Sequence, residues 1–301
     1  MFVLLLGRET IVVDTRHECL QEKTGMARDN DVILLSIADE GRVDLDSIIV
    51  PISYMRRETY YSTIVLFIEH SLYTNNTKFF NKMKEKLRIN IEKFNKPKIH
   101  IANYRIKLYY EYLKSHTFNR VIHCDVSDIY FQSDVFKYIP ENGKLVMFKE
   151  GCNSIMLLSD QKNLQWYKEC YPNLDGLDST KEIINAGIVL GGYDQMLKYM
   201  EIIWNLLETN KKCDISTFGP DQAVVEYAYH NGLLKQLIGK VESGPVYCNT
   251  HQFKYKGGNY LSYGVMYDNY DCVVPFIHGR PPYYPQKRID FEISLYRENK
   301  A

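Results

Sequence analysis

The chain has 301 residues, which is long enough for one large α/β domain or two small domains with a sizeable core. Lysine plus arginine equals aspartate plus glutamate at 37 each, so the overall charge favours neither a nucleic-acid nor a membrane partner. The seven cysteines occur singly, and their odd number and wide spacing fit neither a disulfide framework nor a zinc cluster, which predicts reduced thiols.

The first 60 residues contain four short β-like runs separated by charged turns. These runs are Phe2–Leu6, Ile11–Val13, Val32–Leu35 and Ile48–Val50. A nucleotide-binding α/β domain needs its first strand here, and the pattern does not single out one run. The first run is too short for a signal core or a membrane span, so we expect a cytoplasmic protein without a transmembrane segment.

The next segment alternates strands and helices. Ser62–Ile68 predicts a buried strand, and Pro97–Ile101 a shorter one. Lys78–Phe94 predicts a helix, because five apolar residues recur at three- and four-residue steps: Phe80, Met83, Leu87, Ile91 and Phe94. A second helix is predicted over Asn103–Ser115.

The remaining pattern continues the alternation. Strands are predicted at Lys144–Phe148, Ile183–Leu190 and Cys272–Ile277, and helices at Tyr193–Glu208 and Asp221–Asn231. Between them, Glu150–Lys181 predicts a loop-rich stretch typical of a functional lid. Strands that alternate with helices favour a mainly parallel sheet covered on both faces, in a single α/β domain.

Two carboxylates, Asp125 and Asp128, follow Val121 and Ile122, which end another predicted strand. Open α/β sheets bind their ligands at the carboxyl ends of strands, and cations such as Mg²⁺ or Mn²⁺ prefer oxygen ligands while leaving positions for phosphates. We therefore hypothesise that this pair is the metal–diphosphate corner of a sugar-nucleotide site. The alternative is a helix cap beside a surface acid.

Four motifs follow one another between residues 100 and 280: Asn103–Ile106, Asp125–Gln132, Asn185–Gly187 with Asp221–Gln222, and Phe276–Gly279. In order and spacing they resemble nucleotide-sugar glycosyltransferases of the GT-A fold. They are most similar to the retaining glycogenin-like enzymes and to the glycosyltransferase domains of collagen lysyl hydroxylases. The resemblance implies a GT-A (Rossmann-like), mainly parallel sheet flanked by helices, in one domain over residues 1–301. Residues 1–60 match poorly and leave the base contacts unassigned.

The acid pair resembles the Asp-x-x-Asp variant of the family's metal motif. That resemblance implies that Asp125, Asp128 and a late histidine, His278, bind Mn²⁺ (or Mg²⁺), with diphosphate oxygens completing the coordination. The metal would neutralise the charge that grows on the departing nucleoside diphosphate. The alternative for His278 is an ordinary turn histidine. His123 is expected to be a strand residue beside the site and not a ligand.

The family often has a basic residue that reaches the diphosphate. The resemblance implies this role for Arg105 and, in the C-terminal loop after Gly279, for Arg280, since an arginine fork suits phosphate oxygens. Lys107 and Lys287 are the next candidates. Each of the four basic residues is also consistent with a solvated surface charge.

Two further motifs resemble the sugar-binding part of the family. Asn185, Ala186 and Gly187 resemble the small-residue strand that lets the sugar approach the backbone, the alternative being a core strand with a bulge. Asp221 and Gln222 resemble the Asp-Gln pair beside the transferred sugar, where Asp221 would hold sugar hydroxyls or the oxocarbenium charge. The alternative for Asp221 is an acid favoured by a helix N-terminus.

These expectations converge on a metal-dependent glycosyltransferase. It would move a hexose from a UDP-sugar to a hydroxyl group of a glycan or protein acceptor, with retention of configuration and no nucleic-acid partner. The alternative is a catalytically inactive GT-A-fold module that binds a sugar or a partner. A phosphohydrolase with Asp125 as nucleophile fits less well, because Asp-Val-Ser-Asp is a poor match to its motif.

Overall fold

The computed structural model describes residues 24–41, 44–150, 157–174, 176–242 and 273–278, together with the backbone of four short strands outside them. These four strands form two antiparallel hairpins: β1 (Val3–Leu6) with β2 (Glu9–Val12), and β11 (Tyr260–Ser262) with β12 (Val265–Tyr267). Cys19, Cys152, Cys248, Cys272, Gly279, Arg280 and Lys287 lie outside the described residues.

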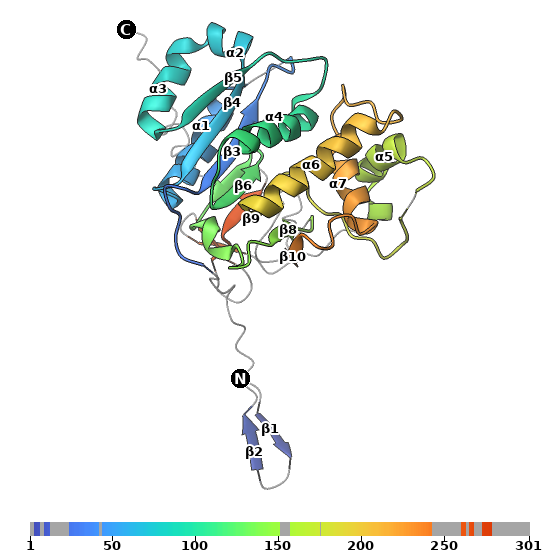
Figure 1. The fold of residues 1–301 in the computed structure, drawn as a ribbon. Helices are drawn as coiled ribbons and strands as arrows, with labels where there is room; N and C mark the ends of the chain where they lie inside the picture. The colour runs from blue at the N-terminus through green and yellow to red at the C-terminus, as the bar shows by residue number, and fades with distance from the viewer. Residues whose placement is uncertain are drawn as a thin grey trace.

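A seven-stranded sheet organises the described chain (Figure 1). Its strand order is β10-β8-β9-β6-β3-β4-β5, and only β9 runs antiparallel to its neighbours within this sheet. The strands are β3 (Val32–Ile37), β4 (Thr63–Glu69), β5 (Asn90–Phe94), β6 (Arg120–Cys124), β8 (Leu145–Phe148), β9 (Ile188–Gly192) and β10 (Ile238–Glu242). The expected α/β architecture with a mostly parallel, Rossmann-like sheet is confirmed.

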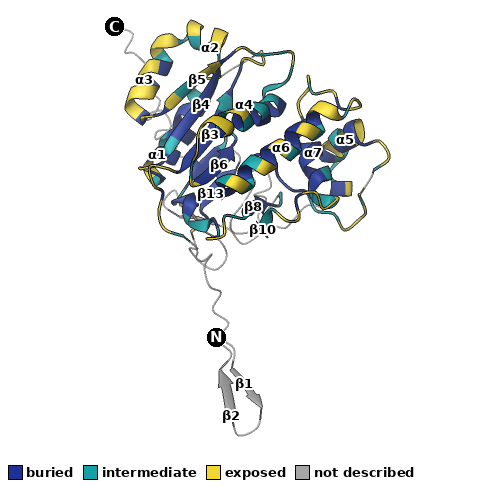
Figure 2. Ribbon diagram, in the orientation of Figure 1, coloured by how far each residue is buried: buried dark blue, intermediate teal, exposed yellow. Residues whose placement is uncertain are grey.

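Helices cover both faces of this sheet. They are α1 (Asp46–Glu58), α2 (His70–Asn75), α3 (Thr77–Leu87), α4 (Ile101–Ser115), α5 (Gln161–Cys170), α6 (Tyr193–Thr209) and α7 (Pro220–His230), with 3₁₀ turns η1 (Val135–Tyr138) and η2 (Leu157–Ser159). Alternate residues of β3 enter different cores, since Ile33 packs with α1 and α3 while Leu34 packs with α4, α6 and α7. The central strands are therefore almost wholly buried, while the edge strands β5 and β10 keep exposed residues (Figure 2).

One short run expected as a strand is part of a helix. Ile48–Val50 lies within α1, where Ile48, Ile49 and Ile52 are buried on the helix face that meets the sheet. A short apolar run does not distinguish a strand from a buried helix segment, and here the helix forms.

The expected helix Lys78–Phe94 ends early, because Arg88 adopts a left-handed conformation at the C-terminus of α3. The chain then extends as β5, which pairs with β4 and carries Ile91 and Phe94. Pro97–Ile101 forms no strand; Ile101 instead begins α4, whose N-terminus is capped by the His100 ring, which accepts a hydrogen bond from Ala102 N at 3.2 Å.

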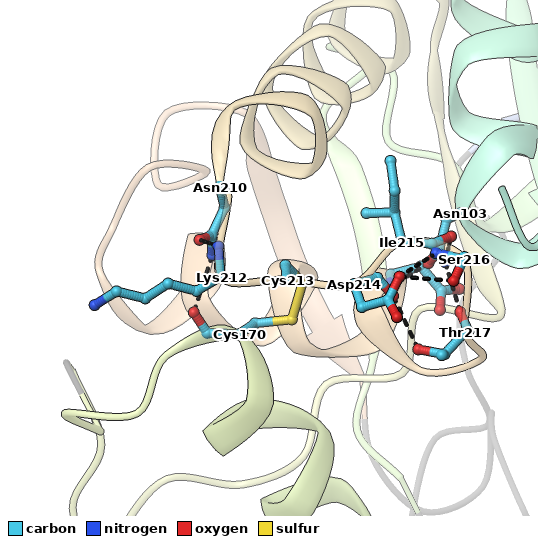
Figure 3. Close-up of a disulfide and its surroundings, with 10 residues drawn as sticks. Asn103, Cys170, Asn210, Lys212, Cys213, Asp214, Ile215, Ser216 and Thr217 are labelled. Carbon is cyan, nitrogen blue, oxygen red and sulfur yellow. Dashed lines mark hydrogen bonds between the residues drawn. A yellow bond between two sulfur atoms is a disulfide. The ribbon is translucent and has the colours of Figure 1, made fainter. Parts of the chain in front are cut away.

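The expectation of reduced thiols is wrong for one pair. Cys170, at the end of α5, and Cys213, in the segment after α6, form a disulfide across 43 residues (Figure 3). The stretch Glu150–Lys181, which was expected to be loop-rich, contains the helix α5. Tertiary packing brings the two thiols together, so their wide spacing in sequence was no argument for reduced thiols. Among the described cysteines, Cys124 is a buried free thiol.

No helix in the described part of the chain combines the length and apolar character needed to cross a membrane.

Candidate metal centre

Asp125 lies at the carboxyl end of β6, next to the topological switch point of the sheet. From β3 the chain adds β4 and β5 on one side and then returns to place β6 on the other side. Crevices at such switch points are where open α/β sheets bind ligands. The backbone N–H of Asp125 donates to Gly187 O at 2.8 Å, which ties the first acid to the segment that leads into β9.

Strand pairing brings the other two candidate ligands to the same place. Asp128 directly precedes β7 (Ile129–Phe131), and β7 pairs antiparallel with β13 (Phe276–His278). In this register His278 is opposite Ile129. The two-stranded pairing therefore sets an imidazole beside the acids, although about 150 residues separate them in sequence.

The three side chains lie close enough to share one cation. His278 Nε2 is 3.5 Å from Asp125 Oδ2 and 3.7 Å from Asp128 Oδ2. One ligand atom from each of the three residues lies within 4.8 Å of the other two. The carboxylates are 31% and 36% exposed while the imidazole is 9% exposed, so a ligand reaches the acids from solvent and the histidine forms the buried wall.

The charges of the acids, His278 and Arg105 shift one another's pKa values towards the charged forms. Burial by itself lowers the pKa of His278, but the carboxylates of Asp128 and Asp125 outweigh it and raise that pKa. Burial raises the pKa of Asp125, and the charge of Arg105 and the contact with His278 more than reverse this, so that the net pKa is lowered. Asp125 is therefore ionised at neutral pH, as a metal-binding carboxylate must be.

Arg105, on α4, joins two of the candidate functional acids. Its Nη1 pairs with Asp125 Oδ1, and its Nη2 donates to Asp221 Oδ2 at 3.1 Å and to Ala186 O at 3.4 Å. Burial lowers the pKa of Arg105, but the two carboxylates raise it on balance. Asp125 thus directs one oxygen to the guanidinium and the other to His278. In this arrangement Arg105 orients the acids and does not extend into open solvent, since it is only 6% exposed.

Gly187 makes room for the convergence of the metal ligands. A Cβ at this position would lie 2.5 Å from Asp125 Oδ2 and 2.7 Å from His278 Cε1, closer than real Cβ atoms approach other atoms. The neighbouring Asn185 accepts a hydrogen bond from Gly187 N at 2.8 Å and donates to Glu150 Oε1 at 3.1 Å. The small residue is therefore required by the site itself.

Asp221 and Gln222 lie together in the first turn of α7, and each has a different set of partners. Asp221 N donates to Asn103 Oδ1 at 2.8 Å, and burial raises the pKa of the Asp221 carboxyl despite its ion pair with Arg105. Gln222 uses its amide to hold the backbone, accepting from Ala186 N at 2.8 Å and donating to Ile184 O at 2.7 Å.

Glu150 is a nearby acid that the sequence reasoning missed. It follows β8 by two residues, and its Oε2 accepts from Asn163 Nδ2 at 3.5 Å. Burial raises the pKa of Glu150, while Asn185 and the charge of His278 oppose that shift. The available signal was its position just beyond a predicted strand, because β8 runs parallel to β6 and ends at the same edge of the sheet.

Two other predicted residues lie apart from the cluster. His123 is fully buried in β6 between the rings of Tyr109 and Tyr199, and burial lowers its pKa to about 3, so it is neutral. It does not belong to the group of described residues that could share a cation. Lys107 lies over the Trp204 ring at 5.2 Å, on the outer surface of α4 and α6.

The donor set fits a divalent cation of the Mn²⁺ or Mg²⁺ type. Two carboxylates supply the oxygen ligands that such ions prefer, and first-row metals tolerate an added imidazole. The absence of a Cβ at Gly187 leaves the facing oxygen of Asp125 unobstructed. An ion here would offset the excess of acids around the single guanidinium of Arg105.

Comparison with protein-family models finds none that matches the chain. Comparison with curated proteins finds no match either.

Proposed function

We propose that the protein is a metal-dependent glycosyltransferase of the GT-A type, which transfers a hexose from a UDP-sugar to a hydroxyl acceptor with retention of configuration. The observation that carries the proposal is the convergence of Asp125, Asp128 and His278 at the switch point of a mostly parallel sheet. Nucleotide ligands bind in that crevice in open α/β folds, and the donor set suits a cation that also binds diphosphate.

In this proposal each group of residues around the site has its own role. Asp125, Asp128 and His278 would hold the cation, which supplies charge neutralisation for the leaving diphosphate. Arg105 fixes the orientation of Asp125 and keeps it ionised. The buried backbone at Ala186 and Gly187 lies beside Asp125 and His278, and the absence of a side chain at Gly187 leaves room for these two ligands.

Two further acids, Asp221 and Glu150, are linked to this backbone, Asp221 through Arg105 and Glu150 through Asn185. Asp221 is held by Arg105 and by the helix N-terminus, which suits a group that positions sugar hydroxyls or balances developing positive charge. Glu150 is oriented by Asn185 and Asn163, and its raised pKa makes it suitable for exchanging a proton with a sugar or acceptor hydroxyl.

A screen of UDP- and GDP-sugars with Mn²⁺ tests the proposal, with release of the nucleotide as the measured signal. We expect turnover with a UDP-hexose that EDTA abolishes. Asp128→Ala should slow release about a thousandfold or more, because a bound metal contributes several kcal/mol to stabilising the charge of the leaving group.

The matched control is Asp29→Ala, since Asp29 is an exposed acid outside the ligand cluster. Wild-type rates in this variant are expected. Metal-dependent binding of a UDP-sugar without any nucleotide release would instead identify a binding module, and an Asp128→Ala variant with full activity would remove the metal site from the mechanism.

A further inference from the structure

A cavity of about 540 Å³ lies between the end of α1 and the turn that joins α3 to β5. Four cationic side chains and two tyrosines line most of it: Arg56, Arg57, Lys86, Arg88, Tyr54 and Tyr60. Among the described residues that line the cavity, none is acidic. This distribution of charge is unusual in a chain with no net charge, and it favours an anionic ligand.

The floor of the cavity is a buried arginine bound by backbone alone. The Arg56 guanidinium donates to five carbonyl oxygens, including Ser62 O at 2.7 Å, Leu87 O at 2.8 Å and Arg88 O at 3.0 Å. Burial, together with the charge of Arg88, lowers the pKa of Arg56 to about 10, so it remains cationic at neutral pH. Its charge therefore adds to the positive potential of the cavity while its hydrogen bonds hold the three surrounding segments together.

Two arginines at the walls stack on aromatic rings. Arg57 lies 4.2 Å from the centroid of the Tyr54 ring, and Arg88 lies 3.9 Å from that of Tyr60. Stacking uses the face of a guanidinium and leaves donors along its edge for oxyanions. Arg57 also pairs with Glu58 at 2.6 Å, but Glu58 does not line the cavity.

The backbone conformation of Arg88 is a further indication that its side chain has a role in the cavity. Its φ of 49° lies in the left-handed region, where glycine is the usual residue at the end of a helix. The surrounding segment is also basic, since residues 77–98 contain eight lysines and arginines and two glutamates.

This cavity is separate from the candidate metal centre. Ser62 directly precedes β4 and Arg88 precedes β5, so the cavity lies at the amino ends of these strands. Asp125 follows the carboxyl end of β6, which runs parallel to β3 and hence to β4. The two sites are therefore at opposite edges of the sheet.

We propose that this basic cavity is a second binding site, which takes a ligand bearing phosphate groups. Arg57, Lys86 and Arg88 supply the donors for the phosphate oxygens, and the size of the cavity admits a sugar-sized or nucleotide-sized body attached to the phosphates. The ligand is either a soluble phosphorylated molecule or the phosphorylated headgroup of a lipid.

Calorimetric titration with inorganic pyrophosphate tests the site. The buffer contains EDTA, so that no cation can hold pyrophosphate at Asp125 and Asp128. We expect binding that weakens with salt and that falls about tenfold or more in a double variant, Lys86→Gln with Arg88→Gly. Glycine suits the left-handed backbone and keeps the carbonyl that Arg56 binds, so the double variant is expected to retain the melting temperature of the wild type.

The control is Lys235→Gln, because Lys235 is an exposed cation far in sequence from the cavity and not among its lining residues. A flotation assay with phosphatidylinositol-phosphate vesicles distinguishes a lipid headgroup from a soluble ligand. Vesicle binding by the wild type and not by the double variant assigns a lipid headgroup. Pyrophosphate binding without vesicle binding assigns a soluble ligand. Equal pyrophosphate binding by wild type and double variant, no binding by either, or binding of an acidic peptide in preference to pyrophosphate would each overturn the proposal.

Discussion

At the scale of single residues, Arg105 links the candidate metal centre to the candidate sugar site. One guanidinium binds Asp125 and Asp221 at the same time, and within this group Arg105 and Asp221 are buried while Asp125 is partly exposed. Breaking such a pair leaves an uncompensated buried charge, which is strongly destabilising. The orientation of Asp125 Oδ2 towards His278 therefore depends on a residue that need not touch any ligand.

Gly187→Ala is the sharpest single-residue test of the metal centre. The new methyl group overlaps Asp125 Oδ2 and the His278 ring, and these side-chain ends can turn away without unfolding the sheet. We expect Mn²⁺ affinity to fall about 10–100-fold, the loss typical when the support of a metal ligand is disturbed. Electron paramagnetic resonance of free Mn²⁺, measured with and without UDP, gives the affinity.

Gly25→Ala is the matched control, because its Cβ would meet only Arg28 Nη2, at an ordinary 3.7 Å. Its Mn²⁺ affinity should equal that of the wild type. If Gly187→Ala also bound Mn²⁺ normally, the three predicted ligands would not share a cation.

At the scale of elements, the segment between α6 and α7 positions Asp221. The disulfide fixes one end of this segment to α5, and Asn210 Nδ2 reinforces the junction by donating to Cys170 O at 3.0 Å (Figure 3). Further along, Asn103 Nδ2 donates to Ile215 O at 2.9 Å and to Thr217 O at 2.8 Å. The same Asn103 accepts from Asp221 N, so the segment and the start of α7 are held by one buried side chain.

Removal of the disulfide is expected to destabilise the fold. In the chain-entropy model, a bridge across 43 residues contributes about 4 kcal/mol. The double variant Cys170→Ser with Cys213→Ser should therefore melt at a lower temperature than the oxidised wild type. Thermal unfolding with and without dithiothreitol measures the effect, and the double variant should no longer respond to the reductant.

Cys124→Ala provides the comparison, since Cys124 is a buried free thiol that takes no part in the bridge. It should keep the reductant-sensitive melting of the wild type. A wild-type melting temperature that did not change on reduction would show that the bridge contributes no stability.

At the scale of the whole molecule, a polar network crosses the core that α5, α6 and α7 form on one face of the sheet. Glu226 is 1% exposed, and its Oε1 accepts from Ile184 N and from Gln222 Nε2, each at 2.8 Å. Its Oε2 lies 3.1 Å from His230 Nε2. Burial, and to a lesser degree the charge of Glu150, raises the pKa of Glu226 well above its usual value.

This raised pKa makes the stability of the fold depend on pH. Above pH about 4.3 the unfolded chain releases the Glu226 proton while the folded chain keeps it, so the contribution of Glu226 to stability falls as pH rises. Glu226→Gln is isosteric with the neutral acid and lacks this loss. The free energy of unfolding, measured by urea titration at several pH values, should favour the variant increasingly from pH 5 upward.

Glu208→Gln is the control, because Glu208 is exposed on α6 and makes no buried contact. Its stability should follow the wild type at every pH. A constant difference between Glu226→Gln and wild type across the range would mean that Glu226 is already ionised in the fold.

Much of the fold was predictable because local periodicity and burial agree. Ser62–Ile68 and Asn103–Ser115 were expected as a strand and a helix, and the structure has β4 and α4 there. The error at Lys78–Phe94 arose where an apolar stripe continued past a helix end set by the left-handed Arg88. Periodicity alone does not show where a helix stops if the next strand also needs apolar residues.

The candidate site was also predictable only in part. The local pattern was enough to place Asp125 and Asp128 after a buried strand, and their separation of three positions keeps them close in any fold. The partners of Glu150, Arg105 and Cys213 lie 35, 20 and 43 residues away in sequence, and the three-dimensional fold was needed to identify them. The physical reason is that strand order, β7–β13 pairing and helix packing bring distant segments together, and no local pattern encodes those distances.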